Sequence, residues 1–266
     1  MKQLNWTKLG FIVDGIFFLV LALGFGLQIP WVTWIWDWSD DPMTGIFLTA
    51  LLASYSAGSL LLAWLEEWRA AIGGAIALVI GFGGFAISAA LMALNGSGTD
   101  LIIHAAVMGV IAAIAVATAF NGLGDTSKTS RPLPRGLRYT YLALAPLMVL
   151  IGIELLLHIP AILPWPLTWQ TSMLLGWILI GFSANYAYVA LRGDWAAGQV
   201  LLFGFLVYDI AFIVPLLQHA GDVVGEDFWI SQVINVCVVV FSAPLAVYYL
   251  FLNRQTRLGT AAGADH

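Results

Sequence analysis

Three acidic residues, Asp14, Glu154 and Asp209, lie inside long apolar stretches of this 266-residue chain. A carboxylate near the centre of a bilayer is costly, so such a residue is by default a candidate for function. No Lys or Arg lies at the depth of Glu154 or Asp209, so we expect both groups to be protonated, hydrogen-bonded or bound to a cation. Asp14 lies closer to a helix end, where it can reach the headgroups.

Other polar residues share the outer half of the membrane with these acids. Counting along the expected helices places six residues there: Asp209, Glu154, His158, His104, Asn235 and Gln232. We expect Asp209 to border an outward-facing polar cavity with Asn235 or Gln232. Glu154 and His158, four residues apart and hence on one helix face, would line its entrance. The alternative is a set of satisfied hydrogen bonds between helices, without any ligand.

The common catalytic and cofactor motifs are absent from the sequence. It contains no phosphate-binding Gly-rich loop, no His-Glu-x-x-His and no Gly-x-Ser-x-Gly. Two histidines near a glutamate are compatible with a metal or haem, but no two histidines are four residues apart, so the cofactor stays unknown. The single cysteine, Cys237, excludes a disulfide framework. Short loops also disfavour a conventional enzyme.

The composition requires a membrane environment. Apolar residues make up 61% of the chain and charged residues 9%, with a mean hydropathy of +0.92, whereas a soluble domain carries about 25% charged residues. The net charge of -5 excludes the clustered basic face that a nucleic-acid partner requires. The expected partner is the lipid bilayer, and either a membrane-protein partner or a second copy of the chain remains open.

Eight segments are long and apolar enough to span the bilayer, which takes about 20 residues of helix. They lie near 9–29, 45–65, 71–94, 101–121, 138–159, 169–191, 197–218 and 229–251. The sequence therefore predicts an all-α, polytopic fold without an extramembrane domain.

The charged residues predict the orientation of these helices. All ten Lys and Arg residues fall on one side, in the termini and in alternate loops, whereas the opposite loops carry only acids. Because basic residues mark the cytoplasmic side, both termini should be cytoplasmic. Eleven of the twelve tryptophans fall at helix ends or in the loops, as headgroup-seeking rings should, and Trp177 is the exception.

The chain also repeats itself. A shift of 127 residues over positions 38–70 gives nine identities in 33 positions, including Trp38 with Trp165 and Trp68 with Trp195. With a shift of 130, Leu27 matches Leu157. The sequence thus predicts a first four-helix repeat at 1–121, a basic cytoplasmic linker at 122–137 and a second repeat at 138–266. Because each repeat has an even number of helices, the two should be oriented in parallel.

Small residues recur every fourth position along two predicted helices. Gly73, Ala77 and Gly81 form one such stripe, and Ala105, Gly109 and Ala113 form another. Small-residue stripes let membrane helices approach closely. We therefore expect the helix at 71–94 to pack through its stripe against the helix at 101–121.

The stretch from Trp165 to Trp195 combines an outer Trp-Pro-Leu-Thr with Asp194-Trp195 in the next inner loop. It resembles bacterial multi-pass membrane proteins built from a duplicated four-helix unit, although Trp38-Ser39-Asp40-Asp41 replaces Trp-Pro-Leu-Thr in the first half. The resemblance implies no activity and no site residues. We expect a multi-pass protein of the cytoplasmic (plasma) membrane of a bacterium or archaeon.

Two functions of different class fit these features. The first is a small permease or channel-like protein that handles protons, a cation or a small solute, with the acids along its path. The second is a non-catalytic accessory or scaffold subunit of a larger membrane complex, associated with lipid or pigment. A water-accessible cavity at the acids favours the first function, and a solid interior with an apolar face favours the second.

Overall fold

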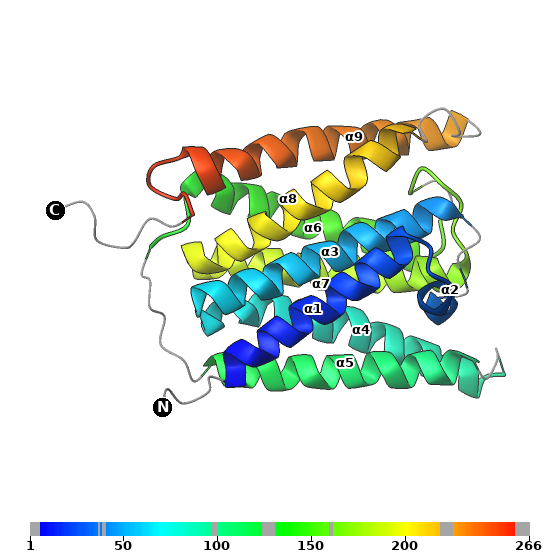
Figure 1. The fold of residues 1–266 in the computed structure, drawn as a ribbon. Helices are drawn as coiled ribbons and strands as arrows, with labels where there is room; N and C mark the ends of the chain where they lie inside the picture. The colour runs from blue at the N-terminus through cyan, green and yellow to red at the C-terminus, as the bar shows by residue number, and fades with distance from the viewer. Residues whose placement is uncertain are drawn as a thin grey trace. The chain divides into compact units, whose positions relative to one another are not determined.

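The computed structural model describes residues 6–36, 38, 41–96, 100–123, 131–159, 162–218 and 226–258, which form helices joined by short connections (Figure 1). Eight helices in this part are long and apolar enough to cross a membrane. The prediction of a multi-pass, all-α membrane protein is confirmed at that level. Positions 124–130, most of the predicted linker, lie outside the described residues.

The eight long helices overlap the eight predicted segments. They are α1 (Trp6–Gly26), α3 (Pro42–Leu65), α4 (Ala71–Leu94), α5 (Asp100–Leu123), α6 (Arg135–Leu156), α7 (Trp169–Arg192), α8 (Trp195–Gln218) and α9 (Glu226–Val247). Four short helices complete the described chain: α2 (Pro30–Thr33), η1 (Trp34–Trp36), η2 (Trp68–Ala70) and the π-helix η4 (Tyr248–Leu252).

Packing divides the chain into two compact units. Unit 1 comprises Met1–Glu67, Pro160–Thr168 and Gln199–His266, and unit 2 comprises Trp68–Ile159 and Trp169–Gly198. Unit 1 therefore contains α1, α3, α9 and most of α8, and unit 2 contains α4, α5, α6 and α7. Each unit takes two long helices from each half of the sequence, so the packing units and the predicted sequence repeats are different divisions of the chain.

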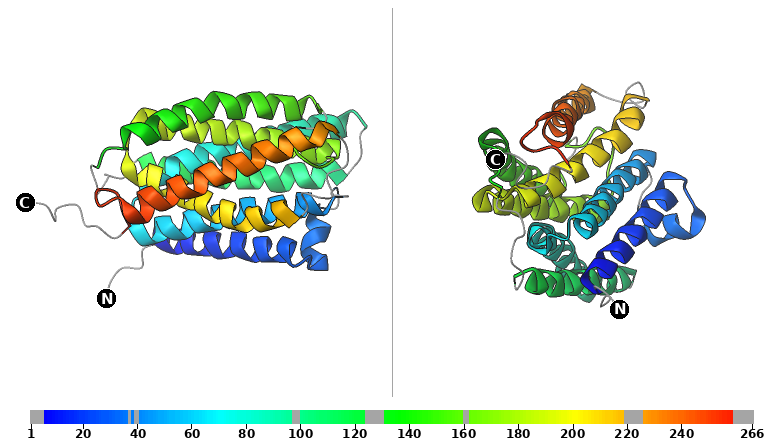
Figure 2. Two further views of the ribbon diagram at one scale, coloured as in Figure 1. Left: turned by 90° about the horizontal axis from the view of Figure 1, so that it is seen from above. Right: turned by 60° about the vertical axis from the view of Figure 1, so that its left-hand side comes forward.

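In unit 1, α1 and α3 run side by side (Figure 2). A side chain at Gly15 would meet Leu60 at 2.6 Å, so glycine is what allows this approach. The Ser56 hydroxyl donates to the Gly15 carbonyl at 2.7 Å. The Phe18 ring stacks on Tyr55 with 5.7 Å between centroids. Small residues and one buried hydrogen bond thus fix the α1–α3 contact.

In unit 2, the small-residue stripe of α4 faces α7 rather than α5. Gly81 lies against the Ile178 backbone, and a Cβ at Gly181 would meet the Ala77 carbonyl oxygen. The predicted partner of this stripe is therefore wrong. The contact of α4 with α5 uses a different face of α4, where Ala86 approaches Gly109.

Trp177, the tryptophan that does not follow the predicted interfacial pattern, lies in the middle of α7. Its indole Nε1 donates to Ser88 Oγ on α4 at 3.0 Å. Its ring lies where a side chain at Gly84 would be. Because its N–H is satisfied inside unit 2, this indole does not need the headgroup region.

Two helices end in the same way without a glycine. Gln28 after α1 and His158 after α6 both adopt the left-handed conformation, with φ of 52° and 53°. At each end the following isoleucine donates to a carbonyl five residues back, Ile29 to Gly24 at 2.8 Å and Ile159 to Glu154 at 3.0 Å. These bonds define a Schellman motif, which satisfies the last carbonyls of the helix.

Replacing Gln28 with Gly is expected to stabilise the protein by about 1 kcal/mol, because the left-handed conformation costs an L-residue about that much. Gln28→Val should be destabilising, since a β-branched residue tolerates a positive φ least. Thermal unfolding in detergent measures both changes. A Val variant that is as stable as the Gly variant would contradict the cap geometry.

Candidate functional site

Asp209 on α8 is the most buried acid of those predicted for the site. It is only 1% exposed, and its hydrogen-bond partner within unit 1 is Ser242 on α9, whose Oγ lies 2.7 Å from Asp209 Oδ2. Both residues lie well inside apolar helices of candidate membrane spans. The pair is therefore a polar contact between two membrane-spanning helices.

Ser242 also faces a carbonyl of its own helix. Its Oγ lies 2.8 Å from the Val238 carbonyl oxygen. A hydroxyl has one proton to donate and two lone pairs that accept. With Asp209 protonated, the carboxyl can donate to Ser242 while Ser242 donates to Val238, and both bonds are made. With Asp209 ionised, the two acceptors compete for the single serine proton.

Asp14 forms a second acid–serine pair, also in unit 1. Its Oδ2 accepts a hydrogen bond from Ser59 Oγ at 2.5 Å, which joins α1 to α3. Asp14 is only partly buried and lies about two turns into α1. The structure thus gives Asp14 a partner on a neighbouring helix, in addition to the route to the headgroups that its position suggested.

The other two predicted residues of unit 1 bond elsewhere. Gln232 Nε2 donates to the Leu216 carbonyl at 2.7 Å, which ties α9 to α8. Asn235 Nδ2 donates to the Ser231 carbonyl one turn back in its own helix at 2.9 Å. The hydrogen bond of Asp209 goes to Ser242, which the sequence analysis missed. A signal existed, because the repeat mates of Asp209 and Ser242 are Phe82 and Ala115, so the acid and the serine differ together from the other half.

The remaining three predicted residues belong to unit 2. His104 Nδ1 lies 2.9 Å from the Asp100 carbonyl, within the first turn of α5. Glu154 is partly buried in the last turn of α6, and His158 is exposed. Because α6 ends at Leu156 and His158 is left-handed, Glu154 and His158 do not lie on one helical face as predicted. Pro160, which follows Ile159, disfavours any longer helix.

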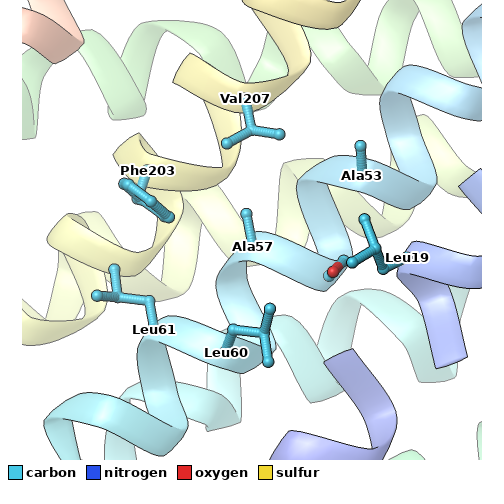
Figure 3. A pocket seen from close by; sticks show the side chains of 8 residues that line it. Leu19, Ala53, Ala57, Leu60, Leu61, Phe203 and Val207 are labelled. Carbon is cyan, nitrogen blue, oxygen red and sulfur yellow. The ribbon is translucent and has the colours of Figure 1, made fainter. Parts of the chain in front are cut away.

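A groove of about 420 Å³ lies on unit 1 between α1, α3 and α8 (Figure 3). Its lining consists of Leu19, Ala53, Ser56, Ala57, Leu60, Leu61, Phe203 and Val207. Ser56 is the only polar side chain among them, and its hydroxyl is already bonded to Gly15. This groove is apolar and Asp209 does not line it, so a polar cavity beside Asp209 stays a prediction.

An aromatic cluster adjoins Asp209 in the sequence of α8. Phe47 of α3 contacts the rings of Trp165, Tyr208 and Phe212 at centroid distances of 5.6, 5.9 and 5.5 Å. Trp165, from the connection between α6 and α7, donates its Nε1–H to Thr44 Oγ1 at 3.1 Å. The connection is thereby fixed to α3 and α8 of unit 1.

Within the described part of the chain, no three His, Cys, Asp or Glu residues come together in a way that could hold a metal ion. Comparisons of the chain with protein-family models, with curated proteins and with solved structures find no significant match.

Proposed function

We propose that the protein is a small permease or channel-like protein that moves protons, a cation or a small solute across the membrane. The observation that carries this proposal is Asp209, a 1% exposed acid inside a membrane helix with Ser242 as its hydrogen-bond partner in unit 1. A buried intramembrane acid without a basic partner is typical of proton and ion pathways.

The geometry around Ser242 gives this acid a way to act. Protonation of Asp209 lets the carboxyl, the serine hydroxyl and the Val238 carbonyl form a continuous chain of bonds. Loss of the proton forces Ser242 to choose between Asp209 and Val238. Gain and loss of one proton therefore change a contact between α8 and α9, which is the local event that a proton-dependent transporter needs.

We also infer that the chain contains two parallel four-helix repeats. A shift of 127 residues carries both ends of α3 onto both ends of α7. It also carries Glu66, which is left-handed and donates to the Leu62 carbonyl, onto Gly193, which is left-handed and donates to Val189. Helix ends that match in position and in conformation support a duplication more strongly than apolar identities do.

Helix contacts match under the same shift. A Cβ at Gly204 of α8 would meet Ser54 of α3 at 2.9 Å in unit 1, and their mates, Ala77 of α4 and Gly181 of α7, are in contact in unit 2. A second matched pair is Gly58 with Val200 and Asn185 with Gly73. In each unit the third helix of one repeat packs on the second helix of the other, which supports a symmetric arrangement such as transporter repeats have.

A second candidate function rests on the apolar groove of unit 1. A groove with no available polar group suits a hydrocarbon chain, so a scaffold or accessory subunit associated with lipid or pigment fits it. This function requires no movement of protons, which separates it from the first.

Reconstitution into liposomes tests the proposed function. A pH-sensitive dye trapped inside reports proton entry after a potassium diffusion potential is set with valinomycin, and a sodium gradient provides the second driving force. We expect faster pH change than in protein-free liposomes under at least one gradient. Rates equal to protein-free liposomes under both, together with a co-purifying lipid or pigment in the absorption and mass spectra, would favour the scaffold.

The orientation is a separate prediction. In a Cys237→Ser background, Thr99→Cys and Gly221→Cys should react with a membrane-impermeant thiol reagent in whole cells, because both lie in loops without basic residues. Ser127→Cys, in the basic linker, should react only after lysis. The three positions lie outside the described residues, and the reverse labelling pattern would overturn the proposed cytoplasmic termini.

A further inference from the structure

Unit 2 carries a polar cluster where η2 begins and α7 ends. Its members are Arg69, Asn185, Tyr188, Arg192 and Asp194, and the charges of Arg69, Arg192 and Asp194 all act on the Tyr188 hydroxyl. Two guanidinium groups face one carboxylate, so the cluster has an excess of positive charge. Asp194 also accepts a hydrogen bond from the Ala196 N–H at 3.1 Å in the first turn of α8.

Two side chains of this cluster lack partners among the residues that the structure describes. Arg69 Nε is buried and has no hydrogen bond. Asn185 is 9% exposed, and no side-chain hydrogen bond is recorded for it in this part of the chain. A buried donor or acceptor without a partner costs about 1–3 kcal/mol, and more where the group is charged. A bound group that accepts hydrogen bonds would remove this cost.

Gly73 of α4 makes room for the cluster. A Cβ there would overlap Asn185 Oδ1 and lie 2.9 Å from the Tyr188 ring. The absence of a side chain on α4 therefore lets Asn185 and Tyr188 sit against that helix. Arg69 lies four residues before Gly73, at the start of the same span. The polar groups of α7 and the guanidinium before α4 thus converge on one end of unit 2.

The matching positions of the other half carry no such groups. Under the shift of 127 residues, Arg69 corresponds to Ala196, and the three α7 residues Asn185, Tyr188 and Arg192 correspond to Gly58, Leu61 and Leu65. The same helix contact is therefore made in unit 1 with apolar side chains. Packing alone does not require a polar cluster here, so a ligand is the better explanation for it.

We propose that Arg69, Arg192, Asn185 and Tyr188 bind a phosphate group, carried either by a free anion or by a phospholipid headgroup. Arginine binds phosphate through two parallel N–H donors, and it stays charged at all relevant pH values. The Asn185 amide and the Tyr188 hydroxyl supply further neutral donors. Basic pockets between membrane helices on the cytoplasmic side are suited to phosphorylated headgroups, and the predicted orientation places Arg69 on that side. The site is separate from the Asp209–Ser242 pair of unit 1.

Binding to the purified, delipidated full chain in detergent tests this proposal. The two probes are inorganic phosphate and short-chain phosphatidic acid, and the readouts are a thermal-shift titration and native mass spectrometry. We expect at least one probe to bind the wild type, and Arg69→Gln and Arg192→Gln to weaken it by at least about tenfold, as loss of a charge-assisted bidentate contact predicts. Arg138→Gln, an exposed arginine of α6 in the same unit, is the matched control and should bind like the wild type.

The two probes distinguish the sources of the phosphate. Similar affinity for both indicates a free anion, whereas binding of phosphatidic acid alone indicates a lipid headgroup, and both outcomes support the site. Two Arg variants are used so that misfolding of one, detected by its melting temperature without probe, leaves the other informative. Failure of both probes to bind the wild type overturns the proposal, as does binding by both folded variants that equals the wild type.

Discussion

Asp209→Asn is expected to abolish gradient-driven flux in liposomes, with a loss of at least about tenfold relative to the wild type, because it removes a carboxyl at the depth where an acid is most costly. Asn has nearly the same shape and retains a hydrogen bond to Ser242. It cannot gain or lose the proton, so Ser242 no longer switches between Asp209 and Val238. Folding and membrane insertion should be unchanged.

Asp14→Asn is the matched control, since it makes the same chemical change in the other acid–serine pair of unit 1. Asp14 is only partly buried and lies nearer a helix end, so its variant should retain most of the flux. Ser242→Ala should fall between the two, because Asp209 keeps its proton site and loses its relay partner. Wild-type flux in Asp209→Asn would remove the acid from the mechanism.

Gly181→Leu is expected to prevent stable folding of unit 2. A Cβ at Gly181 would already overlap the Ala77 carbonyl oxygen of α4, and backbone of a neighbouring helix cannot rotate away as a side chain can. Overpacking of this kind costs about 1–3 kcal/mol for small changes, so Gly181→Ala should unfold at a distinctly lower temperature. The leucine variant should be recovered mainly as aggregate.

Gly74 provides the control for this prediction. It lies in α4 beside Gly73, and a Cβ there would have no neighbour within 4 Å. Gly74→Ala should therefore be neutral or stabilising, because alanine has the higher helix propensity. Equal melting temperatures for Gly74→Ala and Gly181→Ala, measured by thermal unfolding in one detergent, would show that α4 and α7 do not approach as closely as described.

Much of the helical arrangement could be predicted from the sequence. Hydropathy and length locate every long helix, because spanning a bilayer requires a continuous apolar segment. The small-residue stripe of Gly73, Ala77 and Gly81 was also a correct indication of close packing. Its partner was not predictable, since a stripe shows which face of a helix is small and not which helix lies opposite. Sequence neighbours were assumed, and α7 packs there instead.

The candidate site was predictable in part for a similar reason. Burial of Asp209 follows from its depth in an apolar segment, whereas its partner depends on which face of α9 meets α8, and that is set by tertiary packing. Ser242 could be found only by comparing both halves, where Phe82 and Ala115 replace the pair. The interpretation of Glu154 and His158 failed because the Schellman cap ends α6 before His158.

The protonation state of Asp209 is the most direct test of the proposed mechanism. Infrared difference spectra of the reconstituted protein, recorded as the pH is stepped, report the carbonyl stretch of protonated carboxylic acids. We predict a band that is present in the wild type and in Asp14→Asn, absent in Asp209→Asn, and reversibly changed in intensity by the pH step. Spectra of the wild type and Asp209→Asn that are identical at every pH would contradict a proton-exchanging Asp209.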